Sequence, residues 1–273
     1  MKCVLLNGKP GSEISILDRG LQYGDGLFET MRVHHQSIPL WKYHWDRLQH
    51  GCERLKIPLP DEQLLSQEIQ QCISATDHAV LKLILTRGIG QRGYVIPDRC
   101  EVSRIFLLGE IPAYPEQFQK KGVRIHSCKT PLGINPVLAG IKHLNRLEQI
   151  LARSEWQGNE YQEGLMCDTN GFVIEGTMSN IFWFYNGTLY TPDLTACGVA
   201  GVMREIVIQL AKEQSISIKM GLWSTKELLK AEEIFISNSL IGIWPVSYIL
   251  NRTFPVGPVT QQLQSTLQAK YAI

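Results

Sequence analysis

The sequence predicts an α+β protein of two lobes. Between residues 3 and 108, short apolar strands alternate with two amphipathic helices, and a longer series of strands and helices follows from residue 123. The stretch between the two series, residues 110–121, contains Pro112 and Pro115, and prolines interrupt regular structure. A chain of 273 residues is long enough to bury two cores of ordinary size. We therefore expect an α+β fold that divides near residue 112.

Composition restricts the class of protein further. Hydrophobic residues make up 44% and charged residues 19% of the chain, as in globular proteins, and the net charge of +1 favours neither nucleic acid nor an anionic membrane as partner. No apolar run approaches the roughly twenty residues of a membrane span. The seven cysteines form no Cys-x-x-Cys pair and are odd in number, which suggests thiols in a reducing compartment. His34 and His35 could suggest a metal site, but a solvated loop is favoured because no third ligand lies nearby in the sequence. We expect a cytoplasmic protein without a bound metal.

The first lobe is predicted to hold strands and two helices. Asn7-Gly8 is a hairpin-type turn pair that ends the first strand. Trp45, Leu48 and Cys52 recur at helical spacing, and Asp61 is a typical residue to begin the next helix. The expected strands are 3–6, 27–33, 79–87 and 103–108, and the expected helices are 41–55 and 61–76.

The second lobe is predicted to contain more strands, including a meander in its middle. A helix is indicated after residue 144 because Leu147, Ile150 and Leu151 recur at three- and four-residue spacing. The expected strands are 123–127, 164–168, 172–175, 180–185, 188–190 and 233–237, and the expected helices are 145–157, 203–214, 224–231 and 259–270.

Lys142 is the most informative single residue. The six residues before it are apolar, small or proline, and an amphipathic helix follows it. Burial lowers the pKa of an amine because the charged form loses hydration, and a neutral amine can form an imine with a carbonyl. The alternative is a lysine that extends its charged end to solvent at a strand–helix junction.

Two segments could bind a heterocycle and a phosphate. Glu175 ends an apolar strand, where it could pair with a protonated ring nitrogen or cap a turn. Glycines at 198 and 201 precede a helix that begins near Val202 and Met203, and N–H groups at a helix start attract phosphate. The segment is neither a Walker loop nor a Gly-x-Gly-x-x-Gly motif, so nucleotide binding is not indicated.

Three further places offer polar side chains. Ser239, in the Ser-Asn-Ser run 237–239, follows a strand at the end where active sites of α/β folds gather. Arg47 lies off the apolar stripe of its helix, where most arginines are simply solvated. Arg92 and Tyr94 lie on a Gly-rich loop and could bind a carboxylate, although an ordinary hairpin is the alternative. An amine, a carboxylate, an arginine and an anion-binding helix start would together suit pyridoxal phosphate.

The chain resembles the class IV pyridoxal-phosphate enzymes. Residues 18–30 (DRGLQYGDGLFET) and 175–182 (EGTMSNIF) carry the resemblance, which continues through 189–191 and 201–204 and covers essentially the whole chain. The class includes branched-chain aminotransferases, D-amino-acid aminotransferases and 4-amino-4-deoxychorismate lyases. Within it, residues 140–149 and 91–94 look most like the lyases.

This resemblance implies an architecture. It suggests a fold type IV enzyme with a smaller N-terminal α/β domain at 1–112, a linker at 113–122 and a larger C-terminal cofactor-binding domain at 123–273. The active site would lie between the two domains, and the enzyme would be a homodimer.

The resemblance also implies roles for the candidate residues. Lys142 would be the catalytic lysine that binds the cofactor aldehyde, and Glu175 would contact the pyridinium nitrogen. The phosphate would be held by Arg47, Ser239 and the backbone of Val202 and Met203. Phe28, Arg92 and Tyr94 would contact the substrate.

Two positions depart from the aminotransferase pattern. Phe28 stands where D-amino-acid enzymes carry a tyrosine that binds substrate carboxylate, and Met203 stands where related aminotransferases often carry threonine. We therefore expect a pyridoxal 5′-phosphate-dependent lyase that converts 4-amino-4-deoxychorismate to 4-aminobenzoate and pyruvate in folate biosynthesis. A class IV aminotransferase for D- or branched-chain amino acids is the second interpretation, and a non-catalytic cofactor-binding protein is the third.

Overall fold

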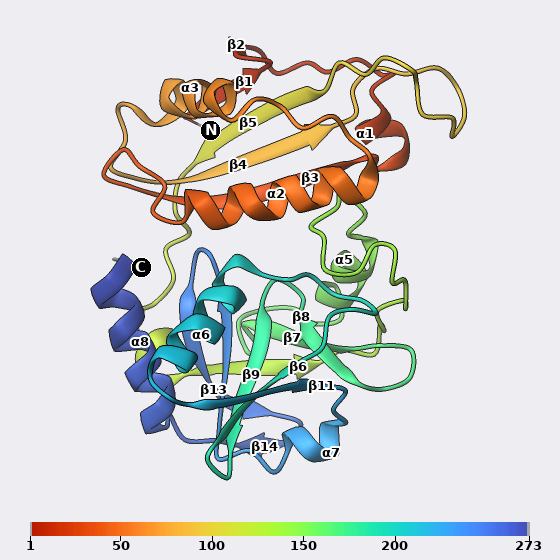
Figure 1. Cartoon of the computed structure of the whole chain (residues 1–273). Helices are drawn as coiled ribbons and strands as arrows, with labels where there is room; N and C mark the ends of the chain where they lie inside the picture. Colours follow the sequence, from red (N-terminus) through yellow and green to blue (C-terminus); the bar gives the residue numbers. More distant parts are fainter. Residues whose placement is uncertain (1, 272–273) are drawn as a thin grey trace. The chain divides into compact units, whose positions relative to one another are not determined.

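The computed structural model describes residues 2–271, which form two compact units. The first unit runs to Pro112 and also includes Ile141–Asn145, and the second comprises Ala113–Gly140 and the chain from Arg146 onward. Figure 1 shows both units coloured along the sequence. Each combines helices with a sheet, so the predicted α+β class is confirmed. Residues 141–145, expected in the C-terminal domain, group with the first unit.

The first unit is built on an antiparallel sheet in the strand order β2-β1-β5-β4-β3. Its strands are β1 (Cys3–Leu6), β2 (Lys9–Pro10), β3 (Gly26–His34), β4 (His78–Thr86) and β5 (Ser103–Gly109). Side chains along β3 alternate between buried and half-buried, as in a strand with one covered face. The covered face carries Leu27, Glu29, Met31 and Val33.

The helices of this unit are α1 (Arg19–Tyr23), α2 (Trp41–Leu55) and α3 (Glu62–Ile73). α2 packs along β3, and a Cβ at Gly51 would come within 2.8 Å of a Leu27 methyl group. α3 packs on β1 and β5 and begins at Asp61, whose side chain accepts a hydrogen bond from the Leu64 N–H. The predicted bounds of α2 and the predicted Asp61 cap are confirmed.

The second unit contains a larger sheet in the order β11-β10-β9-β12-β13-β6-β7-β8, with β14 paired to β13. Three pairs are parallel, namely β10 with β11, β13 with β6, and β6 with β7. The strands are β6 (Val123–Ser127), β7 (Glu163–Cys167), β8 (Val173–Gly176), β9 (Asn180–Tyr185), β10 (Thr188–Pro192), β11 (Ser217–Gly221), β12 (Glu233–Asn238), β13 (Gly242–Ile249) and β14 (Arg252–Thr253).

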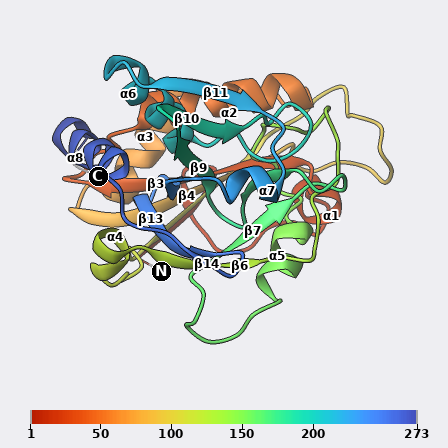
Figure 2. The same ribbon diagram turned by 90° about the horizontal axis from the view of Figure 1, so that it is seen from below.

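Helices α6 and α8 pack beside each other and against β12 of this sheet, as Figures 1 and 2 illustrate. One hydrophobic core cluster of this unit includes the buried side chains of Trp183, Ile236 and Val246, together with Leu228. The helices of the unit are α4 (Gln117–Lys121), α5 (Leu147–Arg153), α6 (Val202–Glu213), α7 (Thr225–Leu228) and α8 (Pro258–Tyr271). No helix among residues 2–271 has the length and apolar character that crossing a lipid bilayer requires.

Four elements longer than two residues lie outside the sequence-based predictions, namely α1, α4, β11 and β13. Pro245 lacks an N–H and argues against a central strand, yet it lies within β13 between β12 and β6. The ladder between β13 and β6 shifts register just beyond it, between Val246 and Tyr248. α1 and α4 have five residues each, too few for a helical period to be read. α5 is also shorter than the predicted helix at 145–157.

Candidate active site

Lys142 lies on a short segment that extends the sheet of the first unit beyond β3. The Phe28 N–H donates to the Lys142 C=O at 3.0 Å, and the Leu144 N–H donates to the Gly26 C=O at 3.0 Å. The Lys142 Nζ lies 4.2 Å from the centroid of the Phe28 ring. The lysine is therefore half-buried, with its backbone fixed and its amine over an aromatic face.

A second amine, which the sequence analysis did not identify, lies near the same ring. The Lys82 Nζ is 5.1 Å from the Phe28 centroid. Lys82 pairs in register with Thr30, two residues from Phe28, so it faces the same side of the sheet. The sequence signal was present, because Lys82 is the one charged residue in the apolar run 79–85.

Glu29 holds Arg47 on the covered face of β3. It accepts hydrogen bonds from Arg47 Nε at 2.8 Å and Nη2 at 2.5 Å, and its other partner is His44 Nδ1 at 2.6 Å. His44 and Arg47 are three residues apart on α2 and therefore lie on one side of the helix. The two-point contact sets the orientation of the planar guanidinium. Glu29 and His44 are partners that the sequence analysis did not single out.

Burial and charge oppose each other in this cluster. Burial alone would raise the pKa of the Glu29 carboxyl, but the charge of Arg47 and the contacts with His44 lower it to about 2. Burial lowers the pKa of His44, and the nearby charges of Arg47 and Lys142 act in the same direction against the effect of Glu29. At neutral pH the cluster is therefore an ionised Glu29, a neutral His44 that donates its Nδ1–H, and a cationic Arg47.

Glu175 lies on β8 in the second unit and is buried. Its Oε2 accepts a hydrogen bond from the Val199 N–H at 2.8 Å. Gly198 allows this approach, because its φ is +83° and a Cβ there would come within 2.8 Å of Ile174. Burial lowers the pKa of the Arg146 guanidinium, and the charge of Glu175 opposes that effect. Glu175 is thus a buried carboxylate with a backbone donor and a cationic neighbour.

The loop that contacts Glu175 leads directly into α6. Gly201 is the N-cap residue of α6, and no side chain caps this end. A Cβ at Gly201 would come within 2.1 Å of Asn180 Oδ1, while Asn180 Nδ2 donates to the Val199 C=O at 2.9 Å. The helix start, where Val202 and Met203 lie, can therefore offer backbone N–H groups to an anion.

Ser237 adds a buried hydroxyl to this end of the unit. It pairs across the strands with Asn180, whose side chain touches the α6 N-cap. Among the described residues, Ser237 Oγ is buried and has no hydrogen-bond partner. Ser239, which the sequence predicted, lies half-buried in the turn after β12. Ser237 belongs to the Ser-Asn-Ser run that the sequence analysis named, but only Ser239 was assigned a role there.

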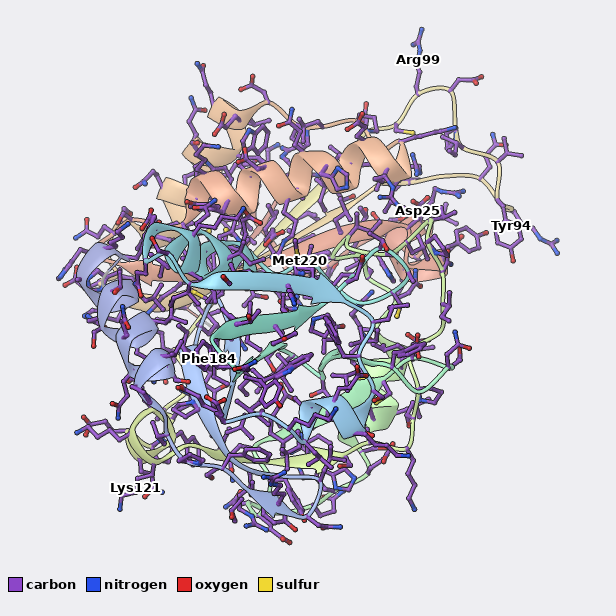
Figure 3. The ribbon with its side chains drawn as sticks, turned by 60° about the horizontal axis from the view of Figure 1, so that its bottom comes forward. Asp25, Tyr94, Arg99, Lys121, Phe184 and Met220 are labelled. Carbon is purple, nitrogen blue, oxygen red and sulfur yellow. The ribbon has the colours of Figure 1, made fainter. Side chains whose placement is uncertain are left out.

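Arg92 and Tyr94 lie in a long loop between β4 and β5, the 88–102 loop. Both side chains are exposed, and Figure 3 shows Tyr94 pointing outward from this loop. The predicted site residues thus form two groups. Phe28, Arg47, Arg92, Tyr94 and Lys142 belong to the first unit, and Glu175, Val202, Met203 and Ser239 belong to the second.

Comparisons with known proteins agree with one another. A family model described as amino-transferase class IV matches residues 26–249. The aminodeoxychorismate lyase of Vibrio harveyi is 36% identical, over 96% of this chain and 98% of that protein. The crystal structure of 4-amino-4-deoxychorismate lyase from Pseudomonas aeruginosa matches with a TM-score of 0.95 at 45% identity, over 97% of this chain and 98% of that one. A D-alanine aminotransferase of Listeria monocytogenes is 27% identical, over 92% of this chain and 88% of that protein.

Replacing Glu29 with Gln should destabilise the chain at neutral pH. The folded pKa of about 2 lies below the ordinary 4.5, so the ionised carboxylate stabilises the fold above about pH 4.5 and loses this effect as pH falls toward 2. A shift of this size corresponds to about 3 kcal/mol at pH 7. Urea unfolding of wild type and Glu29→Gln at pH 7 and pH 3 should show a difference that shrinks in acid. Glu13→Gln, at an exposed position, is the control. A difference that stays constant with pH would contradict the assignment.

Proposed function

The chain belongs to the amino-transferase class IV family, and we propose that it is a pyridoxal 5′-phosphate-dependent aminodeoxychorismate lyase. The reaction converts 4-amino-4-deoxychorismate to 4-aminobenzoate and pyruvate, a step of folate biosynthesis. The observation that best supports this proposal is the similarity to two lyases over nearly their full length, at 36% and 45% identity. The similarity to the D-alanine aminotransferase is lower, at 27%.

The residues present fit pyridoxal phosphate, which carries an aldehyde, a ring nitrogen and a phosphate. For the phosphate, the α6 start has no side-chain cap, and Ser237 Oγ, near it, is a buried hydroxyl without a partner among the described residues. For the ring nitrogen, Glu175 is a buried carboxylate beside that helix start. Met203 contributes only a backbone N–H, where related aminotransferases add a threonine hydroxyl.

In this proposal each predicted cofactor-binding residue has a defined role. Lys142 holds the aldehyde end of the cofactor and Glu175 keeps its ring nitrogen protonated. The phosphate is bound by Arg47, Ser239 and the backbone of Val202 and Met203. Gly140, two residues before Lys142, exchanges backbone hydrogen bonds with the loop at Gly198 and Ala200.

Lys142 also performs the proton transfers. When bound, the cofactor withdraws electrons from the substrate carbon that carries the amine. Once the substrate amine had replaced it at the aldehyde, Lys142 would be a free amine and would take the proton from that carbon. The C–O bond to the enolpyruvyl group would then break, and the ring would become aromatic. Lys142 then returns the proton to the enol carbon, which yields pyruvate. No second keto acid is consumed, in contrast to transamination.

The environment of Phe28 supports an anionic substrate. The substrate carries two carboxylates, and Lys82 places a second ammonium group near the Phe28 ring. Phe28 itself lacks the hydroxyl that D-amino-acid enzymes use to bind a carboxylate. In our proposal Phe28, Arg92 and Tyr94 contact the substrate.

Lys142→Ala should abolish lyase turnover, because the variant lacks the amine that moves both protons. The exposed Lys226→Ala is the matched control and should retain wild-type activity. Borohydride reduction of the wild type with its cofactor, followed by trypsin, should yield the modified peptide 130–146 with no cleavage after Lys142. Appreciable turnover by Lys142→Ala, or label on another lysine, would reject the role of Lys142.

Purified enzyme should eliminate pyruvate from 4-amino-4-deoxychorismate much faster than it transfers amino groups. A class IV aminotransferase would use the same cofactor residues, so the substrate assay decides between the two interpretations. The measurement compares release of 4-aminobenzoate with conversion of D-alanine or L-leucine in the presence of 2-oxoglutarate. Transamination at a rate that matches elimination would favour the aminotransferase, and bound cofactor without either turnover would favour a non-catalytic protein.

We also propose a homodimer, in the cytoplasm. Leu147, Ile150 and Leu151 on α5 are apolar yet 72%, 61% and 58% exposed in the single chain. Such a patch marks an interaction surface, and the dimeric relatives in the class suggest a second copy as the occupant. The seven free thiols suit a reducing compartment, which supports the cytoplasmic location.

Ile150→Lys should weaken the dimer without unfolding the chain, since the side chain is exposed in the single copy. Sedimentation velocity should give a mass of about twice 30.9 kDa for the wild type and a shift toward 30.9 kDa for the variant. Gln261→Lys, at an exposed position of α8, is the control and should stay dimeric. A monomeric wild type, or a variant as dimeric as the wild type, would contradict this placement of the interface.

A further inference from the structure

We propose that Arg19 and Tyr23 are positioning residues that hold the 88–102 loop through the backbone of Gly93. Gly93 stands between Arg92 and Tyr94, so the inference rests on the proposed function, in which these two side chains contact the substrate. Both positioning residues come from α1, inside the 18–30 segment, and neither is among the cofactor-binding residues assigned above.

Hydrogen bonds from α1 engage both polar backbone groups of Gly93. Arg19 Nη1 donates to the Gly93 C=O at 2.9 Å, and the Gly93 N–H donates to the Tyr23 hydroxyl oxygen at 3.1 Å. Gly93 has φ of +103°, a conformation that residues with side chains rarely adopt. The rings of Tyr23 and Tyr94 also meet edge-on, with centroids 5.5 Å apart. The directions in which Arg92 and Tyr94 leave the backbone are therefore fixed, although both side chains are exposed.

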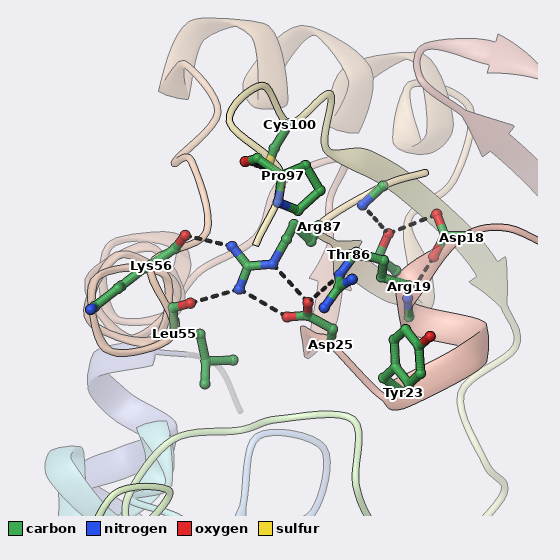
Figure 4. Close-up of polar contacts among 12 residues, drawn as sticks. Asp18, Arg19, Tyr23, Asp25, Leu55, Lys56, Thr86, Arg87, Pro97 and Cys100 are labelled. Atoms are coloured by element: carbon green, nitrogen blue, oxygen red, sulfur yellow. Dashed lines mark hydrogen bonds and ion pairs between the residues drawn. The ribbon is translucent and has the colours of Figure 1, made fainter. Parts of the chain in front are cut away.

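Arg19 is itself held firmly, as Figure 4 illustrates. It is 3% exposed, its Nε donates to Asp25 Oδ2 at 2.9 Å, and its guanidinium lies over the Tyr23 ring at 5.0 Å. Asp25 also accepts hydrogen bonds from Arg87 at 2.7 and 3.0 Å, and Arg87 donates to two carbonyls at the C-terminal end of α2. Burial opposes ionisation of Asp25, but both arginines together lower its pKa. The anchor of the loop is thus connected to α2 by charged hydrogen bonds.

The base of the loop is closed separately. Asp18 is fully buried and accepts hydrogen bonds from Thr86 Oγ1 at 2.9 Å and Ser103 Oγ at 2.7 Å. Thr86 ends β4 and Ser103 begins β5. Next to them, a Cβ at Gly88 would lie 1.9 Å from the Glu101 C=O, so the two arms of the loop approach closely. Asp18 fixes only the two ends of the loop, so the hydrogen bonds of α1 to Gly93 are a second attachment, which holds the part of the loop around residues 92–95.

The tip of the 88–102 loop contributes little to the stability of the fold. Tyr94 is 86% exposed and Val95 is 85% exposed, so neither adds to the core. Ordering an exposed segment costs conformational entropy, and a loop of this length without helix or strand is usually functional. The Tyr23 hydroxyl oxygen accepts its hydrogen bond from the backbone of the loop, at Gly93. These observations together favour a role in substrate positioning over a purely structural one.

Tyr23→Phe tests the inference, because it removes one hydroxyl and leaves the ring in place. We expect KM for 4-amino-4-deoxychorismate to rise about fivefold to tenfold, the effect of one lost hydrogen bond. The value of kcat, the affinity for pyridoxal phosphate and the melting temperature should stay near those of wild type. Trypsin should cleave the folded variant faster after Arg92 and Arg99 than it cleaves the wild type. Tyr185→Phe, on β9 of the second unit, is the matched control and should change none of these values.

A double-mutant cycle shows whether Tyr23 acts through the loop. Arg92→Ala alone should raise KM, and adding Tyr23→Phe to it should raise KM by less than Tyr23→Phe does in the wild type. Fully additive effects would overturn the positioning role. Unchanged KM and unchanged cleavage in Tyr23→Phe would overturn it as well, and so would parallel losses of melting temperature and cofactor affinity. A wild-type chain without lyase activity but with faster trypsin cleavage in Tyr23→Phe would instead refute the proposed function and leave the anchoring of the loop intact.

Discussion

The two-residue period of β3 is the constraint on which the first unit's contribution to the site depends. Phe28 and Glu29 are neighbours in the sequence and therefore point to opposite faces of the sheet. On one face, the Phe28 ring lies beneath the Lys142 amine, while the Phe28 N–H holds the Lys142 backbone. On the other face, Glu29 orients Arg47 from α2. A register shift of one residue would exchange the two faces and lose both contacts at once.

Buried carboxylates with several donors fix the loops around this framework. Glu163 is 1% exposed and accepts hydrogen bonds from Thr177, Met178 and Ser179, the turn that follows Glu175. A carboxylate in such a place is costly unless it is paired, and its removal would leave several donors without an acceptor. Glu29 and Asp25 work in the same way in the first unit, with arginines as their partners. The loops of the site are thus positioned by charge and hydrogen bonding more than by apolar packing.

Local signals in the sequence predicted much of this fold, and long-range contacts account for most of what they missed. The bounds of α2 and the Asp61 cap depend on residues within a few positions of one another, so they could be predicted. β13 was missed because its Pro245 breaks a local rule that the neighbouring strands override. Lys82 was missed and Ser237 was given no role because the relevant neighbours, Phe28 and Asn180, lie on adjacent strands. The resemblance supplied the site residues that periodicity alone could not assign, and their roles stay predictions until they are measured.

The segment 18–30 is recognisable because many of its positions each make a separate structural contact. Asp18 closes the base of the 88–102 loop, and Gly24 ends α1 in a left-handed conformation in which a Cβ would meet Asn145 Oδ1 at 2.3 Å. Gly26 has no room for a side chain either, since a Cβ would lie 2.4 Å from the Leu85 C=O. Asp25, between these glycines, joins the arginines that anchor the loop and the end of α2. If one of these residues were replaced, its neighbours could not restore the lost contact, because each of them already makes a different contact. The density of the motif is therefore a consequence of geometry, in which one turn of helix and one strand connect the 88–102 loop, α2 and the segment that carries Lys142.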